Sequence, residues 1–383
     1  MNTAIFNVRE QAVGRFTLYG VDCSVLVVRE GHLAVTYRKA SIGTVHAFLF
    51  FNMKKIFSFI FLLGTTLTVC AQTQIATLSH EGKISTFYGA NSLKDAHNQA
   101  ENGDVITLSA GSFKAVDFTK LITVRGAGMG IKVDASSIYM EPTVIVGDFN
   151  VTADANSTHH FTLEGISSGN KMTLRGTNGT QFIKCKFYDV NFAANYGGLE
   201  NCTFVHCYVS NSFKKLYNTT FTAISTYFKD ADFYGSSCMF NLNNCIIEVS
   251  NDMNLNCTSL KNCIIIYTGS EKNPEYPTYN QNTSAYNTLW YGETTENPFG
   301  TTAAEHFNSV MSSSEKLFED NTFGKLTTAA KKYLSADGTE VGIYGGNLPF
   351  DATPTNPQIT KFNVASKTTA DGKLSVDIEV KRP

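Results

Sequence analysis

The residue types best suited to acid–base chemistry are a carboxylate, an imidazole and an amine near the middle of the chain. Asp189 and His206 are 17 residues apart, which is a spacing at which a short sequence phrase repeats. If successive repeats stack as coils, Asp189 faces His206 across one strand spacing of about 5 Å, with Lys186 nearby on an outward position. Such a pair could do acid–base work. The alternative is a pair of solvated turn residues that meet by chance.

A second candidate site is a segment rich in aromatic residues. Residues 270–300 contain Pro274, Pro277 and Pro298, which indicate a long loop or an irregular coil. Aromatic faces stack on sugar rings and are costly to expose without a use. We therefore predict carbohydrate binding here, with the alternative that the segment is a hydrophobic lid on the end of the fold. The predicted binding residues are Tyr276, Tyr279, Trp290 and Tyr291, together with Tyr188 on an outward position elsewhere.

We predict no metal or cofactor for this chain. It has no C-x-x-C or H-x-x-x-H pairing of the kind that binds zinc. Asp230 and Asp232 could bind Ca²⁺, but two carboxylates at this spacing are common on strands and turns.

A repeated sequence phrase, apolar-x-Asn-small-x-apolar, predicts the structural elements that position these residues. Four copies begin at Leu199, Leu216, Leu242 and Leu260, and a fifth, at Phe182, has lysine in place of asparagine. Measured at the small residue, the copies are 17, 17, 26 and 18 residues apart. A fixed phrase at this period is typical of a stacked solenoid. The small residues are Cys185, Cys202, Thr219, Cys245 and Cys263, and the threonine favours buried packing over disulfides.

The start and end of the repeated region add a resemblance. Residues 92–100 have helical periodicity and precede a turn and a strand at 105–108, and Gly342-Ile343-Tyr344-Gly345-Gly346 lies near the other end. These features resemble the N-terminal cap and the closing phrase of right-handed parallel β-helix proteins of the pectate-lyase-like superfamily. The resemblance covers residues 90–350. It implies an all-β, right-handed parallel β-helix solenoid with an N-terminal capping helix and a short C-terminal β segment.

Enzymes of that superfamily cut or modify acidic glycans, but their signatures are absent here. The chain has no Asp-Asp pair, no Asn-Thr-Asp and no Gly-His-Gly. Arginine is the best partner for a substrate carboxylate, and beyond residue 71 only Arg125, Arg175 and Arg382 occur. These absences weigh against an enzyme that acts on a polyanion.

The chain divides into four predicted segments. Residues 53–71 read as a signal peptide, with Met53-Lys54-Lys55, an apolar run and Val69-Cys70-Ala71. Residues 1–52 would then be a wrongly assigned upstream extension, unless they are a real extension that turns the apolar run into a membrane anchor. Cys70 could alternatively carry a lipid. Residues 72–350 form the solenoid, and residues 351–383 form a linker and a pair of strands.

Composition narrows the choice of function. Beyond residue 71 the chain has 24 basic and 30 acidic residues, a net charge of −6, which argues against nucleic acid as a partner. We predict a monomer without a transmembrane segment in the mature chain, located in the periplasm, on the outer surface or outside a bacterium. The preferred function is a non-enzymatic, glycan-binding or adhesin-like scaffold, and the alternative is a polysaccharide lyase or glycoside hydrolase. A long face of Thr, Asn and Ser favours binding, whereas clustered carboxylates with lysine in a groove across three coils favour catalysis. A structural or assembly protein is a third possibility.

Overall fold

The computed structural model falls into two units, Met1–Gln72 and Thr73–Pro383. In the first unit it describes four strands. In the second unit it describes residues 74–137, 139, 141–153, 158–193, 199–214, 219–231, 233, 239–250, 259–268, 284–292, 309–335, 337–364 and 375–381.

The strands of the first unit form one sheet in the order β1-β4-β3-β2. They are β1 (Thr3–Phe6), β2 (Val13–Leu18), β3 (Val21–Val27) and β4 (Leu33–Thr36). Secondary structure in this region does not bear on where translation starts, so the upstream extension stays a prediction. The signal peptide predicted for residues 53–71 lies outside the described residues.

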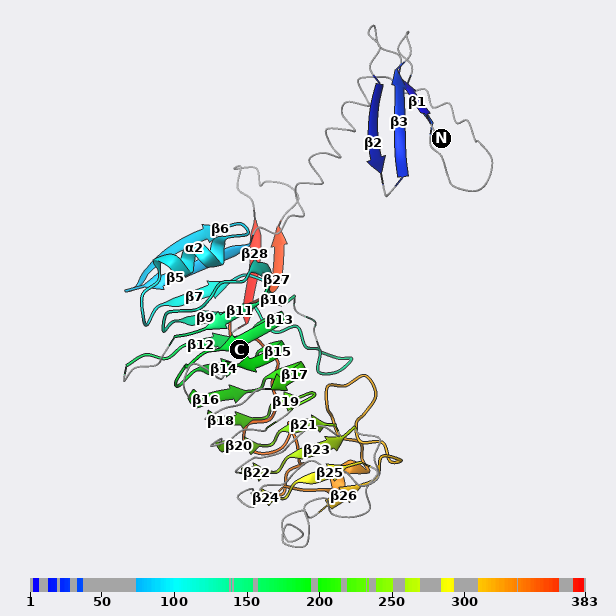
Figure 1. Cartoon of the computed structure of the whole chain (residues 1–383). Helices are drawn as coiled ribbons and strands as arrows, with labels where there is room; N and C mark the ends of the chain where they lie inside the picture. The colour runs from blue at the N-terminus through cyan, green and yellow to red at the C-terminus, as the bar shows by residue number, and fades with distance from the viewer. Residues whose placement is uncertain are drawn as a thin grey trace. The chain divides into compact units, whose positions relative to one another are not determined.

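The second unit is a parallel β-solenoid built from two long sheets (Figure 1). Sheet 1 contains β5 (Ile75–His80), β6 (Lys83–Tyr88), β7 (Val105–Leu108), β9 (Thr123–Arg125), β12 (Thr162–Glu164), β14 (Gln181–Ile183), β16 (Leu199–Val205), β18 (Thr219–Ile224), β20 (Met239–Asn243), β22 (Ser259–Lys261) and β24 (Ser284–Tyr286). Sheet 2 contains β8 (Gly111–Lys114), β10 (Thr143–Val146), β11 (Phe149–Val151), β13 (Ile166–Leu174), β15 (Lys186–Phe192), β17 (Tyr208–Lys214), β19 (Tyr227–Phe228), β21 (Ile246–Val249), β23 (Ile264–Tyr267), β25 (Leu289–Tyr291) and β26 (Ser309–Met311). From β7 onward the chain passes back and forth between the sheets, except that β10 and β11, and also β25 and β26, are consecutive strands of sheet 2. The strands pair in parallel with those of the preceding coil, which confirms the predicted parallel β-helix.

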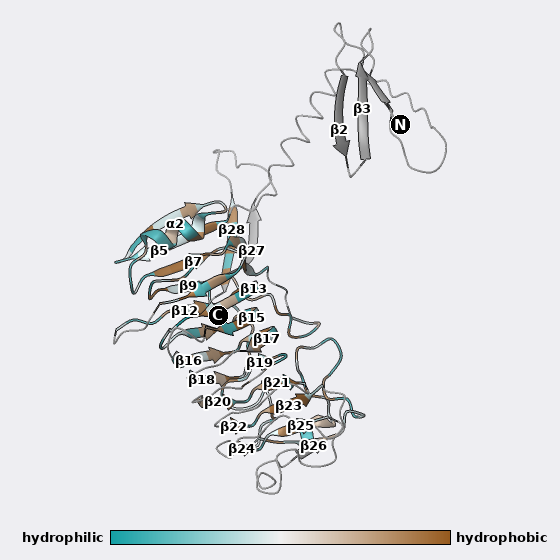
Figure 2. Cartoon of the chain, in the orientation of Figure 1, coloured by the Kyte–Doolittle hydropathy of each residue, from teal (hydrophilic) through white to brown (hydrophobic). Residues whose placement is uncertain are grey.

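Alternation along each strand separates the core from the surface. In β18, Phe221 and Ala223 are buried, whereas Thr222 and Ile224 are half-buried on the outside. Phenylalanine rings fill the middle of the solenoid, and Phe182 stacks on Phe204 with 4.9 Å between ring centroids. The hydropathy colours show the same division, with brown residues recurring in the strands of both sheets (Figure 2).

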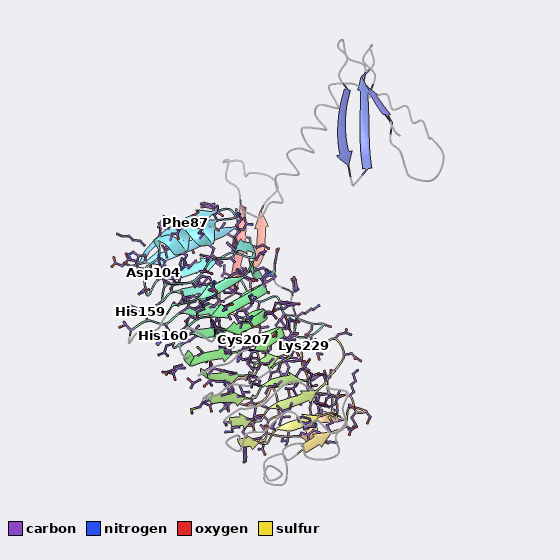
Figure 3. The ribbon with its side chains drawn as sticks, viewed as in Figure 1. Phe87, Asp104, His159, His160, Cys207 and Lys229 are labelled. Atoms are coloured by element: carbon purple, nitrogen blue, oxygen red, sulfur yellow. The ribbon has the colours of Figure 1, made fainter. Side chains whose placement is uncertain are left out.

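One corner of the coils, where the chain passes from sheet 1 to sheet 2, repeats a fixed local structure. A residue with φ between 46° and 55° is followed by a small buried side chain whose S–H or O–H donates to the carbonyl two residues earlier, at 3.0–3.4 Å. The left-handed residues are Lys184, His206, Ser225, Asn244, Asn262 and Asn287, and the donors are Cys185, Cys207, Thr226, Cys245, Cys263 and Thr288. Because thiol and hydroxyl both donate, cysteine and threonine interchange here. Cys207 is labelled in Figure 3.

This corner corrects the alignment of the repeated phrase. Cys207 and Thr226 lie in register with Cys185 and Cys245, so the true spacings are 22, 19, 19, 18 and 25 residues. Cys202 instead pairs with Phe221. The phrase at Asn201 caused the wrong alignment, because Asn201 also has a left-handed backbone, with φ 56°, and also precedes a buried cysteine. A similar turn at another corner of the coil thus has the same sequence phrase. The interpretation of the cysteines as buried packing residues is confirmed for the five whose side chains the structure describes, which are free and buried.

Helix α2 (Ser92–Gln99) covers the start of the solenoid, as predicted for a cap. Leu93 and Ala96 are fully buried on one face of the helix, against the first strands. The helix ends where Lys120 donates from Nζ to the carbonyl oxygens of His97, Asn98 and Ala100, at 2.7, 2.9 and 2.7 Å. A cation at this end also complements the helix dipole.

Next to the cap, His80 and Asp104 form an ion pair with 2.9 Å between Nδ1 and Oδ1. The hydrogen bond to Asp104 raises the pKa of His80 above its ordinary 6.5. The pair therefore stabilises the cap below pH 6.5, and this contribution is lost as the pH rises through the raised pKa. We expect Asp104→Asn to bring the pKa of His80 down toward 6.5 in an NMR titration. A raised pKa that persists in this variant would assign the shift to another group.

A C-terminal segment, residues 339–356, runs back along the outside of the left-handed corner and is called the strap here. Gly342 N donates to Asn262 O at 2.8 Å, Ser225 Oγ donates to Leu348 O, and Lys184 Nζ pairs with Asp351 Oδ2 at 2.6 Å. Asn356 Nδ2 then donates to Gly126 O at 2.7 Å. Because its order is opposite to that of the coils, the strap ties late coils to early ones.

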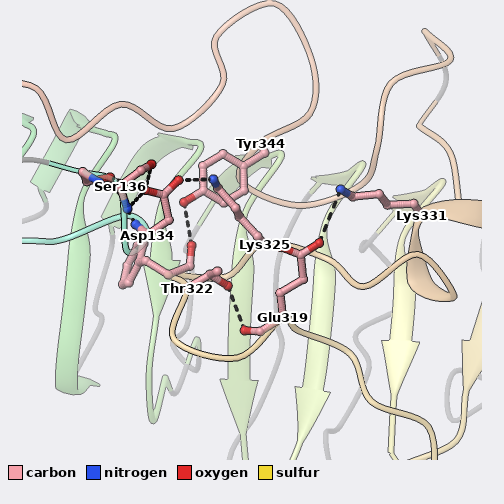
Figure 4. Close-up of polar contacts among 9 residues, drawn as sticks. Asp134, Ser136, Glu319, Thr322, Lys325, Lys331 and Tyr344 are labelled. Carbon is pink, nitrogen blue, oxygen red and sulfur yellow. Dashed lines mark hydrogen bonds and ion pairs between the residues drawn. The ribbon is translucent and has the colours of Figure 1, made fainter.

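The segment before the strap and the first part of the strap together cover part of the outer face of sheet 2. Ile246, Ile264 and Leu289 point outward from this sheet yet are fully buried, because they form a second apolar cluster with residues 317–350. This segment contains a short 3-10 helix, η1 (Ala330–Lys332). The loop between β9 and β10 joins the cluster, and Lys325 Nζ pairs with Asp134 Oδ2 at 2.5 Å (Figure 4).

The predicted C-terminal strand pair is present. β27 (Gln358–Val364) and β28 (Val376–Lys381) form an antiparallel two-stranded sheet. On β28, Val376, Ile378 and Val380 alternate and are about half exposed, at 48%, 52% and 56%.

Candidate functional site

The predicted catalytic pair, Asp189 and His206, is not brought together. Since Ile183 pairs with Val205, His206 lies in register with Lys184, whereas Asp189 pairs with Ser212 and accepts a hydrogen bond from Asn211 at 2.8 Å. The 17-residue spacing used to align them is not the length of this coil, which is 22 residues. Lys186 lies on sheet 2 and pairs with Tyr208, away from His206 in the coil corner.

His206 is a structural residue beneath the strap. It is 8% exposed, and its ring lies 6.1 Å from that of Phe350. Neither ring nitrogen makes a hydrogen bond of normal geometry, although the backbone groups of Leu348 and Asp351 are nearby. Burial, with a smaller contribution from Lys184, lowers the pKa of His206 below 6.5. The side chain is thus shielded from any substrate.

Acid is expected to loosen the strap at this point. Because the folded state holds His206 neutral, stability is lost as the pH falls below about 6.5, where the unfolded chain begins to take up the proton. Hydrogen exchange of the Phe350 amide, which donates to Ile343 O at 2.6 Å, measures the effect. We expect its protection to fall in acid while that of the Ile264 amide stays unchanged. His206→Asn, which matches other left-handed residues in the corner, should remove the pH dependence; an unaltered dependence would rule out His206 as its source.

The aromatic residues of the second predicted site lie in different environments and do not form one site among the described residues. Trp290 is fully buried in the core and stacks on Tyr267 with 5.7 Å between ring centroids, so its indole is unavailable to a ligand. The sequence placed it in a loop, but it lies in β25. Tyr291 is half-buried and donates from its hydroxyl to Glu315 O at 2.8 Å. Tyr188 is 45% exposed on β15, and Tyr276 and Tyr279 lie outside the described residues.

The outer face of sheet 1 carries a feature that sequence analysis missed. One outward position on each of seven successive strands holds a hydroxyl or amide side chain, and we call this row the polar ladder. Parallel register places its members next to one another, and they are Thr123, Thr162, Gln181, Thr203, Thr222, Asn241 and Ser259. Asn241 is exposed and the others are half-buried. Aligning the chain on the corner donors, rather than on the repeated phrase, would have found it.

The polar groups of the ladder side chains lie on the outer face of sheet 1. Among the residues that the structure describes, none of the seven side chains makes a hydrogen bond to another protein group. By contrast, the inward-facing hydroxyls of Thr226 and Thr288 donate to carbonyl groups. A row of unpaired donors and acceptors on rigid strands is suited to a polar ligand with a repeating structure.

A second outward column on sheet 1 borders the ladder. In its middle are Ile183, Val205 and Ile224, all half-buried. At one end Arg125 pairs with Glu164, with 2.8 Å between Nε and Oε2. The face thus combines hydrogen-bonding groups with an apolar strip.

Three charged residues on adjacent coils of sheet 2, Asp148, Lys171 and Asp189, form a group that we call the charged corner. Asp148 and Lys171 are on adjacent coils with 3.6 Å between Oδ2 and Nζ, and Lys171 is in register with Asp189 on the next coil. Both members of the ion pair are well solvated, with side-chain exposures of 61% for Asp148 and 45% for Lys171. Carboxylates and a lysine on three adjacent coils are the residue types expected if the chain is a polysaccharide lyase or glycoside hydrolase.

Metal ligands and membrane-spanning helices are considered only for the part of the chain that the structure describes. No cluster of three His, Cys, Asp or Glu side chains there could hold a metal ion. Asp232, half of the Ca²⁺ candidate, lies outside that part. No helix within it has the length and apolarity to cross a membrane.

Comparisons of the chain with family models, curated proteins and solved structures found no match. The fold class therefore rests on the solenoid itself.

Proposed function

We propose that this chain is an exported, non-enzymatic scaffold that binds a glycan along sheet 1, in the manner of a surface adhesin. The observation that carries the proposal is the polar ladder, with seven neighbouring hydroxyl or amide side chains that make no hydrogen bond to described protein groups. Sugars present hydroxyl groups at regular intervals, so they complement such a row.

The composition of the ladder supports binding rather than catalysis. It contains no carboxylate, imidazole or amine, and these are the groups that most often transfer protons in enzymes. The predicted signal peptide and the low charge of the chain support export to the periplasm, the outer surface or the exterior of a bacterium. A polysaccharide or surface glycan is the expected partner, and the scaffold is expected to act as a monomer.

The charged corner supports a second candidate function, a polysaccharide lyase or glycoside hydrolase. Lys171 lies between Asp148 and Asp189 on adjacent coils, so a base and a carboxylate could act on one sugar ring. Tyr188, on the same sheet, offers an exposed aromatic ring for stacking.

A glycan array probed with the full chain tests the first proposal, and product analysis on each hit separates it from the second. We expect binding without release of reducing ends or formation of unsaturated sugars. Turnover that disappears in Lys171→Met would establish the enzyme instead. An array without any hit would contradict glycan binding altogether.

A further inference from the structure

We infer that the ligand of the polar ladder is a neutral, extended polysaccharide that lies parallel to the solenoid axis. This inference rests on the proposed function and adds the chemical class and the orientation of the ligand.

The orientation follows from the dimensions of sheet 1. The ladder strands are three to seven residues long, so a polymer that crosses the sheet along a strand leaves it after roughly 10–23 Å and passes a single rung. Along the ladder, from Thr123 to Ser259, the seven rungs extend for roughly 29 Å at about 4.8 Å per coil. Only a ligand parallel to the axis contacts all rungs. The rise of one coil is also of the same order as the length of one sugar unit in an extended chain.

The charge of the face selects a neutral ligand. None of the seven ladder side chains is ionisable. The nearest cation at one end, Arg125, is paired with Glu164, which is 8% exposed, and Lys261 at the other end is the remaining cation of the bordering column. A polyanion would lose hydration along the ladder without meeting cations in return.

The apolar strip of the bordering column complements the apolar parts of a sugar, as the ladder complements its hydroxyl groups. Ile183, Val205 and Ile224 border the rungs Gln181, Thr203 and Thr222 on the same three strands. A pyranose ring has polar hydroxyls at its edge and apolar C–H groups on its faces. A sugar chain can therefore bond to the ladder with one edge while a C–H face contacts the strip, which buries apolar surface.

Affinity is expected to come from many weak contacts. One neutral hydrogen bond changes binding by about fivefold. Short oligomers should bind weakly, and affinity should rise with length until the ladder is filled, because each added sugar engages another rung of the same preformed array.

The test compares neutral β-1,4-linked glucose oligomers with oligogalacturonate of matched lengths, by calorimetry on the full chain. We expect the neutral series to bind with an affinity that grows with length and does not change with added salt. The double variant Thr203→Val and Thr222→Val removes two rungs while keeping shape and strand propensity, and should weaken binding by about 25-fold. Thr173→Val, at a half-buried threonine of sheet 2, is the matched control and should bind normally.

The outcomes separate this inference from the proposed function. Preferential, salt-sensitive binding of oligogalacturonate, with no effect of the double variant, would overturn a neutral ligand on the ladder but leave glycan binding intact. Neutral binding without length dependence would overturn the orientation along the axis. An absence of binding to both series, with no hit on a wider glycan array, would remove the inference together with the proposed function.

Discussion

Replacing Phe213 by alanine is expected to lower the free energy of unfolding by about 3–5 kcal/mol. Phe213 is fully buried at the centre of the aromatic core. Its ring centroid lies within 4.8–5.6 Å of five others, those of Phe192, Phe204, Phe221, Phe228 and Phe233. Truncation removes these contacts and leaves a cavity that the flanking strands cannot close, because hydrogen bonds to both neighbouring coils hold β17 in place.

Urea-induced unfolding, followed by circular dichroism, measures this loss. Tyr188→Ala is the matched control, since it removes a large aromatic side chain from the adjacent strand at a position that is 45% exposed. We expect it to cost less than about 1 kcal/mol. A similar loss in both variants would contradict tight packing around Phe213. A solenoid can also unfold in sections, so a second transition in Phe213→Ala would place the weakened boundary at this coil.

The second large effect is expected from Gly345→Ala in the strap. A β-carbon at this position would lie 1.7 Å from the backbone oxygen of Glu340, a contact that no side-chain movement can relieve. The turn that contains Gly345 must therefore open, and this opening also disrupts the packing of the strap against Asn244. Strain of this kind is expected to cost at least about 3 kcal/mol locally.

Hydrogen exchange distinguishes local opening from global unfolding. The Gly342 amide, which donates to Asn262 O, and the Phe350 amide should lose protection, while the Ile264 amide, which donates to Cys245 O, stays protected. Gly169→Ala is the control, because Gly169 is exposed and nothing lies within 4 Å of an added β-carbon. Retained protection of the Phe350 amide in Gly345→Ala would show that the strap closes without this turn.

The fold could be predicted from sequence because it depends on local, repeated rules. Strand alternation in segments such as β18, the small donors of the coil corner and the amphipathic face of α2 each have a signature within a few residues. The same locality explains the error in alignment. Asn201-Cys202 and Asn244-Cys245 have similar backbone turns, and a sequence phrase reports the turn rather than its place in the coil.

The candidate site could not be predicted, since it depends on register between coils of unequal length. Thr203 and Thr222 are neighbours only because Phe204 pairs with Ala223, and Gln181 joins them across a coil of different length. A shift of the assumed alignment by a few residues moved His206 beside Asp189 and hid the ladder.

The strap shows the same limit at longer range. Lys184 and Asp351 are 167 residues apart in the sequence and form an ion pair at 2.6 Å. No local sequence pattern predicts a contact over this separation. The sequence by itself determined a parallel solenoid with a capping helix and, among the described residues, buried and unpaired cysteines, because these follow from periodicity and side-chain chemistry within each coil. The tertiary structure alone decided that His206 is buried, that Trp290 belongs to the core and that sheet 1 presents the polar ladder, because each depends on which coil or returning segment packs against which.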